Sequence, residues 1–381
     1  MSRVDEGLLS DVRRTVGRSA DPIAVAREIR RHSPAASTMQ MLESIGAVID
    51  EVVGAGVLQQ FLYDEDVSDV LVNGPGPVWV DRGGGPVATD VELTDEQSVR
   101  RLAQRLVAAC GRRLDDAVPF ADARLADGTR LHAILPPLSP GGTLLSLRLP
   151  PRRTFSLADL VHAGSLPTAA ADLLRDVVHQ RLAFVISGGT GTGKTTVLST
   201  LLSLADARER IVLVEDAIEL RPHHPHVVRL ESRLPNAEGA GGVDLSLLVR
   251  QALRMRPDRL VVGEVRGREV VDLLAALNTG HEGGASTLHA NRAEHVPARF
   301  EALGVAAGLS REAVHSQLAA AVEIVLQVRR DSNGRRRIAG VAVVQPNSSG
   351  LVHVVPAVGF GCDGVVDGPA APQFYRRLGA A

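Results

Sequence analysis

The sequence predicts an α/β fold for the second half of the chain, preceded by a smaller α+β domain and a helical N-terminal extension. From about residue 153, short apolar segments alternate with helical ones, which is the rhythm of a mostly parallel sheet covered by helices on both faces. Before that point the segments are shorter and are broken by glycine and proline, as in strands joined by turns. We therefore expect domains over 1–55, 56–152 and 153–381.

The composition excludes several classes of protein. A chain of 381 residues with 45% hydrophobic residues can bury a sizeable core in two or three domains. A net charge of -2 and 3% aromatic residues argue against a nucleic-acid binder. No apolar run reaches about 18 residues, so we expect neither secretion nor a membrane span. Two cysteines, Cys110 and Cys362, cannot form a disulfide framework or a cysteine zinc site.

The first 152 residues predict helices, then strands around one longer helix. Asp-Pro and Ser-Pro steps separate three expected helices, over 6–19, 22–31 and 39–56. Alternation around Trp79, closed by a glycine cluster, predicts a hairpin, and further strands are expected over 130–135 and 143–149. Thr94 and Gln97 have the spacing of a capping box for a helix over 98–110, which places Cys110 on its apolar face and ends at Gly111.

The remaining chain reads as alternating strands and helices. Apolar strands are expected over 181–188, 210–216, 258–265 and 284–290. Helices are expected over 194–205, 243–255 and 268–280. The segments 323–330 and 337–344 predict a hairpin that turns at Asn-Gly. The last twenty residues are rich in glycine, proline and alanine, and we expect a loose tail there.

A glycine-rich segment, SGGTGTGKTT, carries the chemistry. It fits the pattern GxxxxGK[ST], follows an apolar strand and precedes a helix, so its backbone N–H groups are expected to surround a phosphate. Lys194, the one lysine of the sequence, would reach the β and γ phosphates, and Thr195 would present its hydroxyl to Mg²⁺. The candidate nucleotide-binding residues are Gly188, Gly189, Thr190, Gly191, Thr192, Gly193, Lys194, Thr195 and Thr196.

Acidic residues follow two of the predicted strands. DRLVVGEVRG ends an apolar strand with Glu264, and Gly263 stands where an aspartate is common. VEDAIEL adds Glu215, Asp216 and Glu219 after another strand. Carboxylates at such positions hold Mg²⁺ or orient an attacking water, which makes Glu264 a candidate metal ligand together with Thr195. A solvated strand end is the alternative for Glu215 and Asp216.

Histidines occur in two groups. TGHEGGASTLHAN places His281 and His289 on either side of a predicted strand, where a histidine can donate to a γ-phosphate and sense its loss. HHPH over 223–226 has no acidic or cysteine partner at ligand spacing, so we expect a solvated loop there and no metal site.

Four motifs in this order, SGGTGTGKTT, VEDAIEL, ALRMRPDRLVVGEVRG and NTGHEGGASTLHAN, resemble the Walker A, Asp, Walker B and His boxes of the type II and type IV secretion ATPases. The resemblance is greatest to the Tad or Flp pilus assembly branch and covers about residues 55–330. It implies a PAS-like domain joined to a RecA-like ATPase domain in a hexamer. Glu264 and Glu219 are implied as acids that orient water, without a choice between them. His281 and His289 fall on the His box.

The resemblance also implies contacts and a function. Arg130, Arg148 and Arg233 fall where arginines contact nucleotide. We expect a cytoplasmic hexameric ATPase that uses ATP and Mg²⁺ and acts on inner-membrane platform proteins to assemble a pilus or secrete protein. It would attach to the membrane through these partners, without inserting and without binding nucleic acid. The alternatives are a nucleotide-gated scaffold that does not hydrolyse ATP, and a nucleic-acid translocase.

Overall fold

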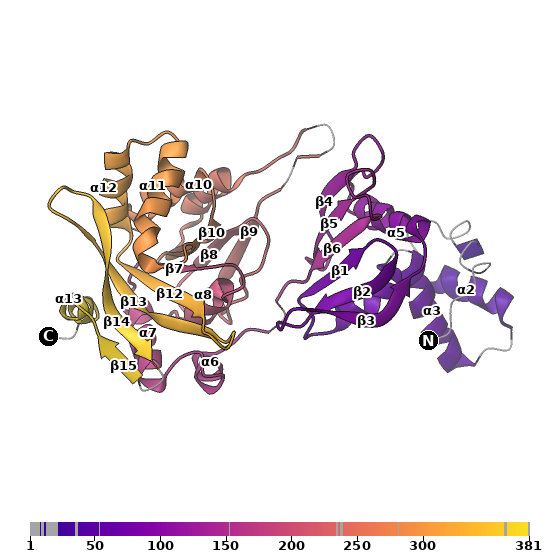
Figure 1. The fold of residues 1–381 in the computed structure, drawn as a ribbon, viewed down its shortest axis with the longest axis horizontal. Helices are drawn as coiled ribbons and strands as arrows, with labels where there is room; N and C mark the ends of the chain where they lie inside the picture. The colour runs from indigo at the N-terminus through magenta and orange to yellow at the C-terminus, as the bar shows by residue number, and fades with distance from the viewer. Residues whose placement is uncertain are drawn as a thin grey trace. The chain divides into compact units, whose positions relative to one another are not determined.

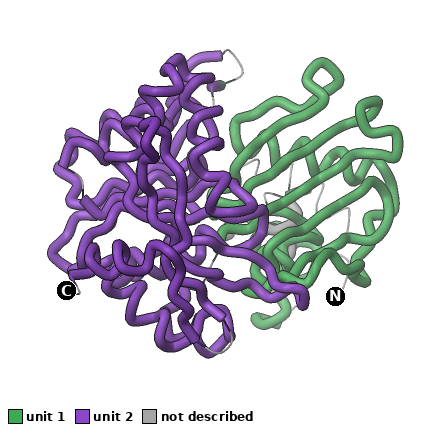
Figure 2. The backbone as a smooth tube through the Cα atoms, turned by 60° about the vertical axis from the view of Figure 1, so that its left-hand side comes forward, with its two compact units in different colours: residues 1–152, 236–238 green, residues 153–235, 239–381 purple. Residues whose placement is uncertain are grey.

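The computed structural model describes residues 8, 11–12, 22–34, 37–52, 54–151, 153–233, 235–236, 239–280, 282–361 and 364–379. The chain divides into two compact units, which Figure 2 colours separately. Unit 1 contains residues 1–152 and 236–238, and unit 2 contains residues 153–235 and 239–381. Most of the helix expected over 6–19 lies outside the described residues, as do His281 and Cys362.

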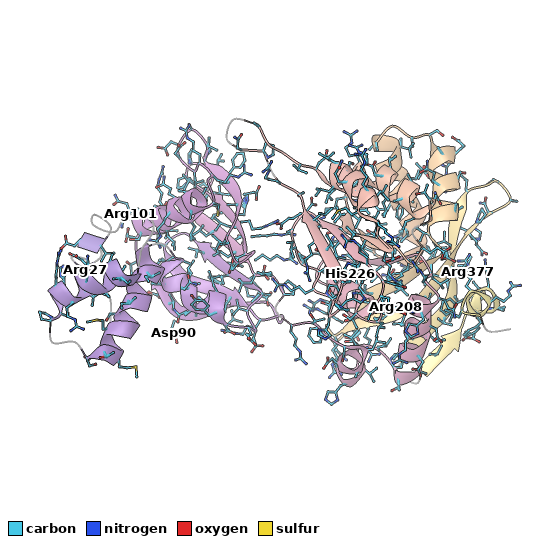
Figure 3. All side chains as sticks on the ribbon, turned by 180° about the vertical axis from the view of Figure 1, so that it is seen from behind. Arg27, Asp90, Arg101, Arg208, His226 and Arg377 are labelled. Carbon is cyan, nitrogen blue, oxygen red and sulfur yellow. The ribbon has the colours of Figure 1, made fainter. Side chains whose placement is uncertain are left out.

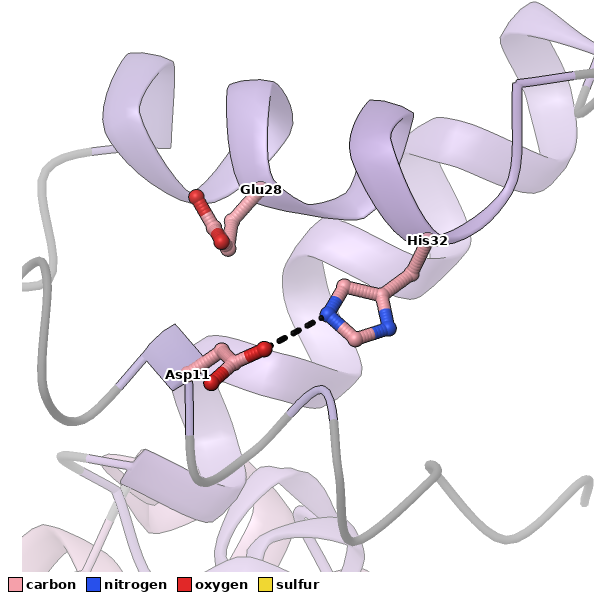
Figure 4. Close-up of side chains that lie close together, drawn as sticks. All are labelled: Asp11, Glu28 and His32. Carbon is pink, nitrogen blue, oxygen red and sulfur yellow. Dashed lines mark hydrogen bonds and ion pairs between the residues drawn. The ribbon is translucent and has the colours of Figure 1, made fainter.

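Two helices, α2 (Pro22–His32) and α3 (Thr38–Val52), form the described part of the N-terminal extension (Figure 1). Val25, Ile29 and Val48 are buried between them. Glu28 and His32 of α2 form a cluster with Asp11, in which the oxygen and nitrogen atoms that could bind a metal lie within 4.8 Å of one another (Figure 4). His32 Nε2 is 3.0 Å from Asp11 Oδ2, and Glu28 pairs with Arg31 at 3.1 Å, so these pairs account for the cluster as a structural feature.

Unit 1 continues as an antiparallel sheet of six strands in the order β3-β2-β1-β6-β5-β4. The strands are β1 (Asp69–Asn73), β2 (Gly76–Asp81), β3 (Pro86–Leu93), β4 (Phe120–Arg124), β5 (Arg130–Ile134) and β6 (Leu144–Arg148). Two short helical segments, η2 (Gly56–Leu58) and α4 (Gln59–Tyr63), lead into β1. The sheet and helix α5 (Glu96–Ala109) share one apolar core.

Helix α5 begins one residue later than the capping box predicts. Asp95, not Thr94, is the N-cap, and its carboxylate accepts the backbone N–H of Ser98. Aspartate supplies the same acceptor as threonine with a full charge at the positive end of the helix dipole, so it is the stronger cap here. Gly111 ends the helix with φ 69° as expected. Cys110 is half-buried at the C-cap rather than a core residue, and burial raises the pKa of its thiol.

Unit 2 is built on a nine-stranded sheet in the order β15-β14-β13-β12-β7-β11-β10-β8-β9. The six strands from β12 to β9 in this order are parallel, and β13 to β15 extend the sheet antiparallel. The parallel strands are β7 (Phe184–Gly188), β8 (Ile211–Glu215), β9 (Val227–Glu231), β10 (Arg259–Val265), β11 (Ala285–His289) and β12 (Ile324–Arg330). The antiparallel strands are β13 (Arg336–Pro346), β14 (Val352–Gly361) and β15 (Gly364–Asp367).

Helices cover both faces of this sheet, as the alternating pattern predicts. Phe184 and Ile186 of β7 belong to the core shared with α6 (Leu157–His162), α7 (Thr168–His179) and α8 (Lys194–Leu202). Val185 belongs to the opposite core. That core is shared with α9 (Leu245–Ala252), α10 (Glu269–Leu277), α11 (Val296–Ala306) and α12 (Arg311–Ala321), with the short segments η3 (Leu253–Met255) and η4 (Ala293–His295) between them. Figure 1 shows α10, α11 and α12 gathered together in orange.

The C-terminal residues are not the loose tail that their composition predicts. They form β15 and then α13 (Ala371–Arg377), whose Phe374 is fully buried in the core of unit 2. The expectation was wrong because the helix has only seven residues, too few for an apolar period to show against the glycine and proline around it. Among the described residues, every helix is too short or too polar to cross a lipid bilayer.

A buried charged group anchors the edge of the sheet where β10 and β11 begin. Arg259 is 1% exposed and pairs with Glu209. Its guanidinium also donates to the carbonyls of Val178 at 2.7 Å and Gly283 at 3.3 Å. A buried cation is stable only when its hydrogen bonds are satisfied, and here the end of α7 and the start of β11 supply the acceptors.

Replacing Arg259 by methionine is expected to lower the free energy of unfolding by about 3 kcal/mol, because the carboxylate of Glu209 loses its buried partner. Arg208→Met is the control: this arginine is 89% exposed in its pair with Asp206 (Figure 3), and its loss should change the stability by less than about 0.5 kcal/mol. Urea unfolding of the two variants measures the difference, and equal effects would contradict an anchoring role for Arg259.

Candidate nucleotide-binding site

The candidate site lies at the edge of the unit 2 sheet where the parallel strands end. The glycine-rich loop follows β7, Glu215 ends β8, Glu264 lies near the end of β10 and His289 ends β11. Since β7, β11 and β10 are adjacent in the sheet, the functional groups at their carboxyl ends come together. Ligands of open α/β sheets bind at this edge.

The loop has the backbone that its sequence predicts. Gly191 and Gly193 have φ of 69° and 94°, in the left-handed region that favours glycine. A Cβ on Gly188 would lie 2.6 Å from the carbonyl oxygen of Val328, so this position also requires glycine. Gly193 is the N-cap of α8, and Lys194 is the first residue of the helix. The described loop thus turns into a helix N-terminus, the geometry that accepts a phosphate.

Lys194 is buried at 7% exposure beneath the loop. Its ammonium donates to the carbonyls of Gly188 at 3.1 Å and Gly189 at 3.0 Å, and it lies 3.4 Å from Nδ1 of His289. His289 Nε2 in turn lies 2.6 Å from Oε1 of Glu264. The structure therefore brings together Lys194, His289 and Glu264, three of the predicted catalytic residues.

The histidine in this group is held neutral by its surroundings. Partial burial lowers the pKa of His289, the carboxylate of Glu264 opposes that shift, and the charges of Lys194 and Arg266 add to it. A neutral imidazole can accept a proton or a hydrogen bond, whereas an imidazolium can only donate. His289 therefore links the acid and the ammonium without adding a third charge.

Arg266 is a site residue that the sequence did not reveal. It pairs with the second oxygen of Glu264. Partial burial disfavours its charge, but the hydrogen bond to Glu264 and the carboxylates of Asp216 and Glu219 raise its pKa overall. Glu264, Asp216 and Glu219 thus all lie within electrostatic reach of Arg266. Only its position two residues after the strand's acid could have indicated this role.

Glu215 is buried, which excludes for this residue the solvated strand end considered from sequence, whereas Asp216 is exposed as that alternative expects. Glu215 is 3% exposed, and its Oε1 accepts the backbone N–H groups of Glu219 and Leu220, each at 3.0 Å. Burial raises the pKa of Glu215 to about 7, although these two donors favour the ionised form. Its other oxygen has no hydrogen-bond partner among the residues that the structure describes. Glu215 is thus a carboxyl group able to change charge near neutral pH.

The same side chain explains the glycine in the Walker B strand. A Cβ on Gly263 would lie 2.8 Å from Cγ and 3.2 Å from Oε1 of Glu215. The carboxylate of Glu215, from the neighbouring strand β8, therefore fills the space that an aspartate at position 263 would need. Glycine at 263 and glutamate at 215 are mutually required in this packing.

Two of the predicted arginines, Arg130 and Arg148, belong to unit 1, whereas the glycine-rich loop belongs to unit 2. In unit 1, Arg130 and Arg148 are directly opposite in register on β5 and β6, and Arg124 is opposite Arg130 on β4. Three arginines thus stand side by side on one face of the sheet, with Asp69 opposite Arg148 on β1 and Asp81 opposite Asp69 on β2. Arg124 was not predicted, because only the strand register shows that it joins the other two.

Arg233 is exposed and donates to the carbonyl of Gly241 at 2.6 Å, within its own loop. Gly280 and Glu282, the described neighbours of His281, precede β11, whereas His289 ends it. The N–H of Phe184 at the start of β7 donates to the carbonyl of Gly284, so Gly284 lies at the sheet edge opposite the P-loop. In the HHPH segment, His224 Nε2 lies 3.0 Å from the carbonyl oxygen of Asp206, and Nε2 of His226, which is labelled in Figure 3, lies 2.8 Å from Nη1 of Arg210.

The fold and loop define a P-loop protein of the RecA-like class, with a smaller α+β unit before it. The model of the type II/IV secretion system protein family matches residues 51–345. The chain therefore belongs to this family.

Relatives of known name agree with this assignment. The chain is 54% identical over 322 residues to a Mycobacterium tuberculosis (strain H37Rv) protein named "Putative conjugal transfer protein", covering 83% of this chain and 91% of that one. It is 33% identical over 309 residues to the type IV secretion system protein PtlH of Bordetella pertussis, covering 74% and 91%. The Legionella pneumophila ATPase DotB has a similar fold, with a TM-score of 0.54 and 18% identity over 75% of this chain and 79% of that chain.

Replacing Gly263 by alanine is expected to destabilise unit 2 by about 1–3 kcal/mol, because the new methyl group overlaps Glu215. Gly84→Ala is the control, since a Cβ there has no atom within 4 Å. Urea unfolding measures both. Adding Glu215→Ala should recover part of the loss, and strict additivity of the two changes would show that the overlap is not the cause.

Stability should depend on pH through Glu215. Its folded-state pKa of about 7 exceeds the ordinary 4.5, so its contribution is fully present below pH 4.5 and is lost as the pH rises through about 7. Between pH 4.5 and about pH 8.5, the free energy of unfolding of Glu215→Gln should therefore rise by roughly 3 kcal/mol relative to that of the wild type. Urea unfolding across this range measures the difference, and a constant offset would refute the assigned titration.

Proposed function

We propose that this protein is an ATP-hydrolysing motor of a type IV secretion, conjugation or pilus system. The observation that carries the proposal is the contact between the P-loop ammonium of Lys194, the imidazole of His289 and the carboxylate of Glu264. A phosphate-binding cation and an acid joined through one histidine are the parts needed to bind a γ-phosphate and respond to its loss.

Each residue has a role in the proposal. The N–H groups of Gly188 to Thr196 bind the phosphates, and Lys194 exchanges its loop carbonyls for phosphate oxygens. Mg²⁺ would be held by Thr195 and by Glu264, and when bound it neutralises charge on the β and γ phosphates. Glu264 orients the attacking water, with Glu219 as the alternative acid. Glu215 lies against the strand that carries Glu264, and its raised pKa makes it a candidate for taking the water's proton.

Family membership supports proposals for the oligomeric state, the further nucleotide contacts and the partners. We propose a homo-hexamer in which Arg130, Arg148 and Arg233 meet nucleotide, as do the histidines of the His box, His281 and His289. The row of Arg124, Arg130 and Arg148 supports an anion contact in unit 1, since adjacent like charges are stabilised by a shared anion. The motor would act on inner-membrane platform proteins from the cytoplasmic side. Assignment to the Tad or Flp pilus branch remains part of this proposal.

A nucleic-acid translocase is the second candidate, because the relative with 54% identity is named for conjugal transfer. ATP turnover that rises several-fold with added DNA would favour it. ATP turnover that does not change when DNA is added would favour a motor that acts on protein.

Lys194→Ala should abolish ATP binding, and Glu264→Gln should keep binding but lower kcat by about 100-fold or more. Glu294→Gln is the control, a matched change of an exposed carboxylate, and should leave kcat unaltered. Phosphate release and nucleotide binding measure the two effects separately. Glu219→Gln and Glu215→Gln in the same assay identify the acid that acts on water.

The assembled wild type could instead bind ATP tightly and release no more phosphate than the Lys194→Ala variant. That result would establish a nucleotide-gated scaffold.

A further inference from the structure

Two arginines of the C-terminal hairpin reach the phosphate-binding loop. Arg330 ends β12 and Arg336 begins β13. Nη2 of Arg330 and Nε of Arg336 each donate to the carbonyl oxygen of Gly191 at 3.1 Å. The Cδ of Arg336 also lies 3.5 Å from where a Cβ of Gly193 would stand. The hairpin therefore lies over the outer side of the loop, from a segment about 140 residues away along the chain.

The placement of these arginines is unfavourable for the hairpin itself. Arg330 and Arg336 are directly opposite in register, and like charges at such positions destabilise a strand pair. In the turn, Nη1 of Arg330 donates to the carbonyl of Gly334 at 3.0 Å, Asp331 Oδ1 accepts the N–H groups of Asn333 and Arg335, and Gly334 has φ 76°. The turn contact uses one nitrogen of Arg330, whereas both arginines share the carbonyl of Gly191 as an acceptor.

The shared acceptor has a geometric consequence for the loop. In a trans peptide the C=O and the following N–H point in opposite directions. Two donors that fix the carbonyl of Gly191 toward the hairpin therefore fix the N–H of Thr192 away from it. Thr192 is in the loop segment whose N–H groups surround a phosphate in this motif.

We propose that Arg330 and Arg336 are positioning residues for nucleoside di- and triphosphates. They hold the peptide between Gly191 and Thr192 in the orientation that presents an N–H to the phosphate chain, and their two charges increase its affinity. This inference rests on the proposed function. Because ADP and ATP both carry phosphate in this loop, the arginines act on ground-state binding and not on the chemical step.

The test compares Arg330→Gln, Arg336→Gln and the double variant with Arg335→Gln in the full chain. Arg335 is an exposed arginine of the same hairpin, so its replacement removes the same charge as either single variant, and half that of the double variant, without a contact to Gly191. The affinity for a fluorescent ADP analogue should fall about tenfold in the double variant and less than about twofold in the control. KM for ATP should rise with little change in kcat. The melting temperature without nucleotide should match that of the wild type.

The outcomes separate this inference from the proposed function. If the wild type binds ADP, Lys194→Ala does not, and the arginine variants bind as the wild type does, the inference is overturned. The proposed function is then unaffected. Absence of ADP binding by the wild type overturns both. Equal losses in Arg335→Gln would show a general charge effect, and a melting temperature that falls in step with affinity would show a purely structural role. Either result overturns the positioning role.

Discussion

The adjacency of strands β7, β11 and β10 is the constraint on which the site depends. Each strand delivers one group to the same sheet edge, so Lys194, His289 and Glu264 meet although they are far apart in sequence. The neutral imidazole of His289 lies between the ammonium of Lys194 and the carboxylate of Glu264, which also pairs with Arg266. The ammonium of Lys194 donates to the neutral carbonyls of Gly188 and Gly189 and lies beside the imidazole of His289.

A second constraint acts between β8 and β10. Glu215 is buried against Gly263, so one strand supplies a carboxyl group where the other lacks a side chain. The site thereby holds two acids on neighbouring strands in different environments: Glu264 is paired with Arg266, and Glu215 is desolvated. Burial that raises the pKa of one carboxyl group in a site is one way in which active sites obtain a proton acceptor near neutral pH.

Much of this arrangement could be predicted from sequence, because the phosphate loop, the strand ends and the parallel sheet have local signals. The alternating pattern predicted β7, β8, β10 and β11, and the P-loop pattern placed Lys194. Other features depend on distant pairings without a local pattern. The burial of Glu215 depends on its neighbour across the sheet, and the contact of Arg336 with Gly191 depends on a hairpin that returns from the C-terminal part. The sequence did not predict helix α13, because its short segment has no apolar periodicity and packs through the buried ring of Phe374.

Strand β11 connects two fixed points. At its beginning the carbonyl of Gly283 is held by the buried guanidinium of Arg259, and at its end His289 contacts the acid and the ammonium. A strand bonded to a neighbour on each side and tethered at one tip resists sliding along its own axis. The sheet therefore fixes the backbone that carries the imidazole, so a change in the position of the ring would come from rotation of the His289 side chain or from the loops rather than from the strand.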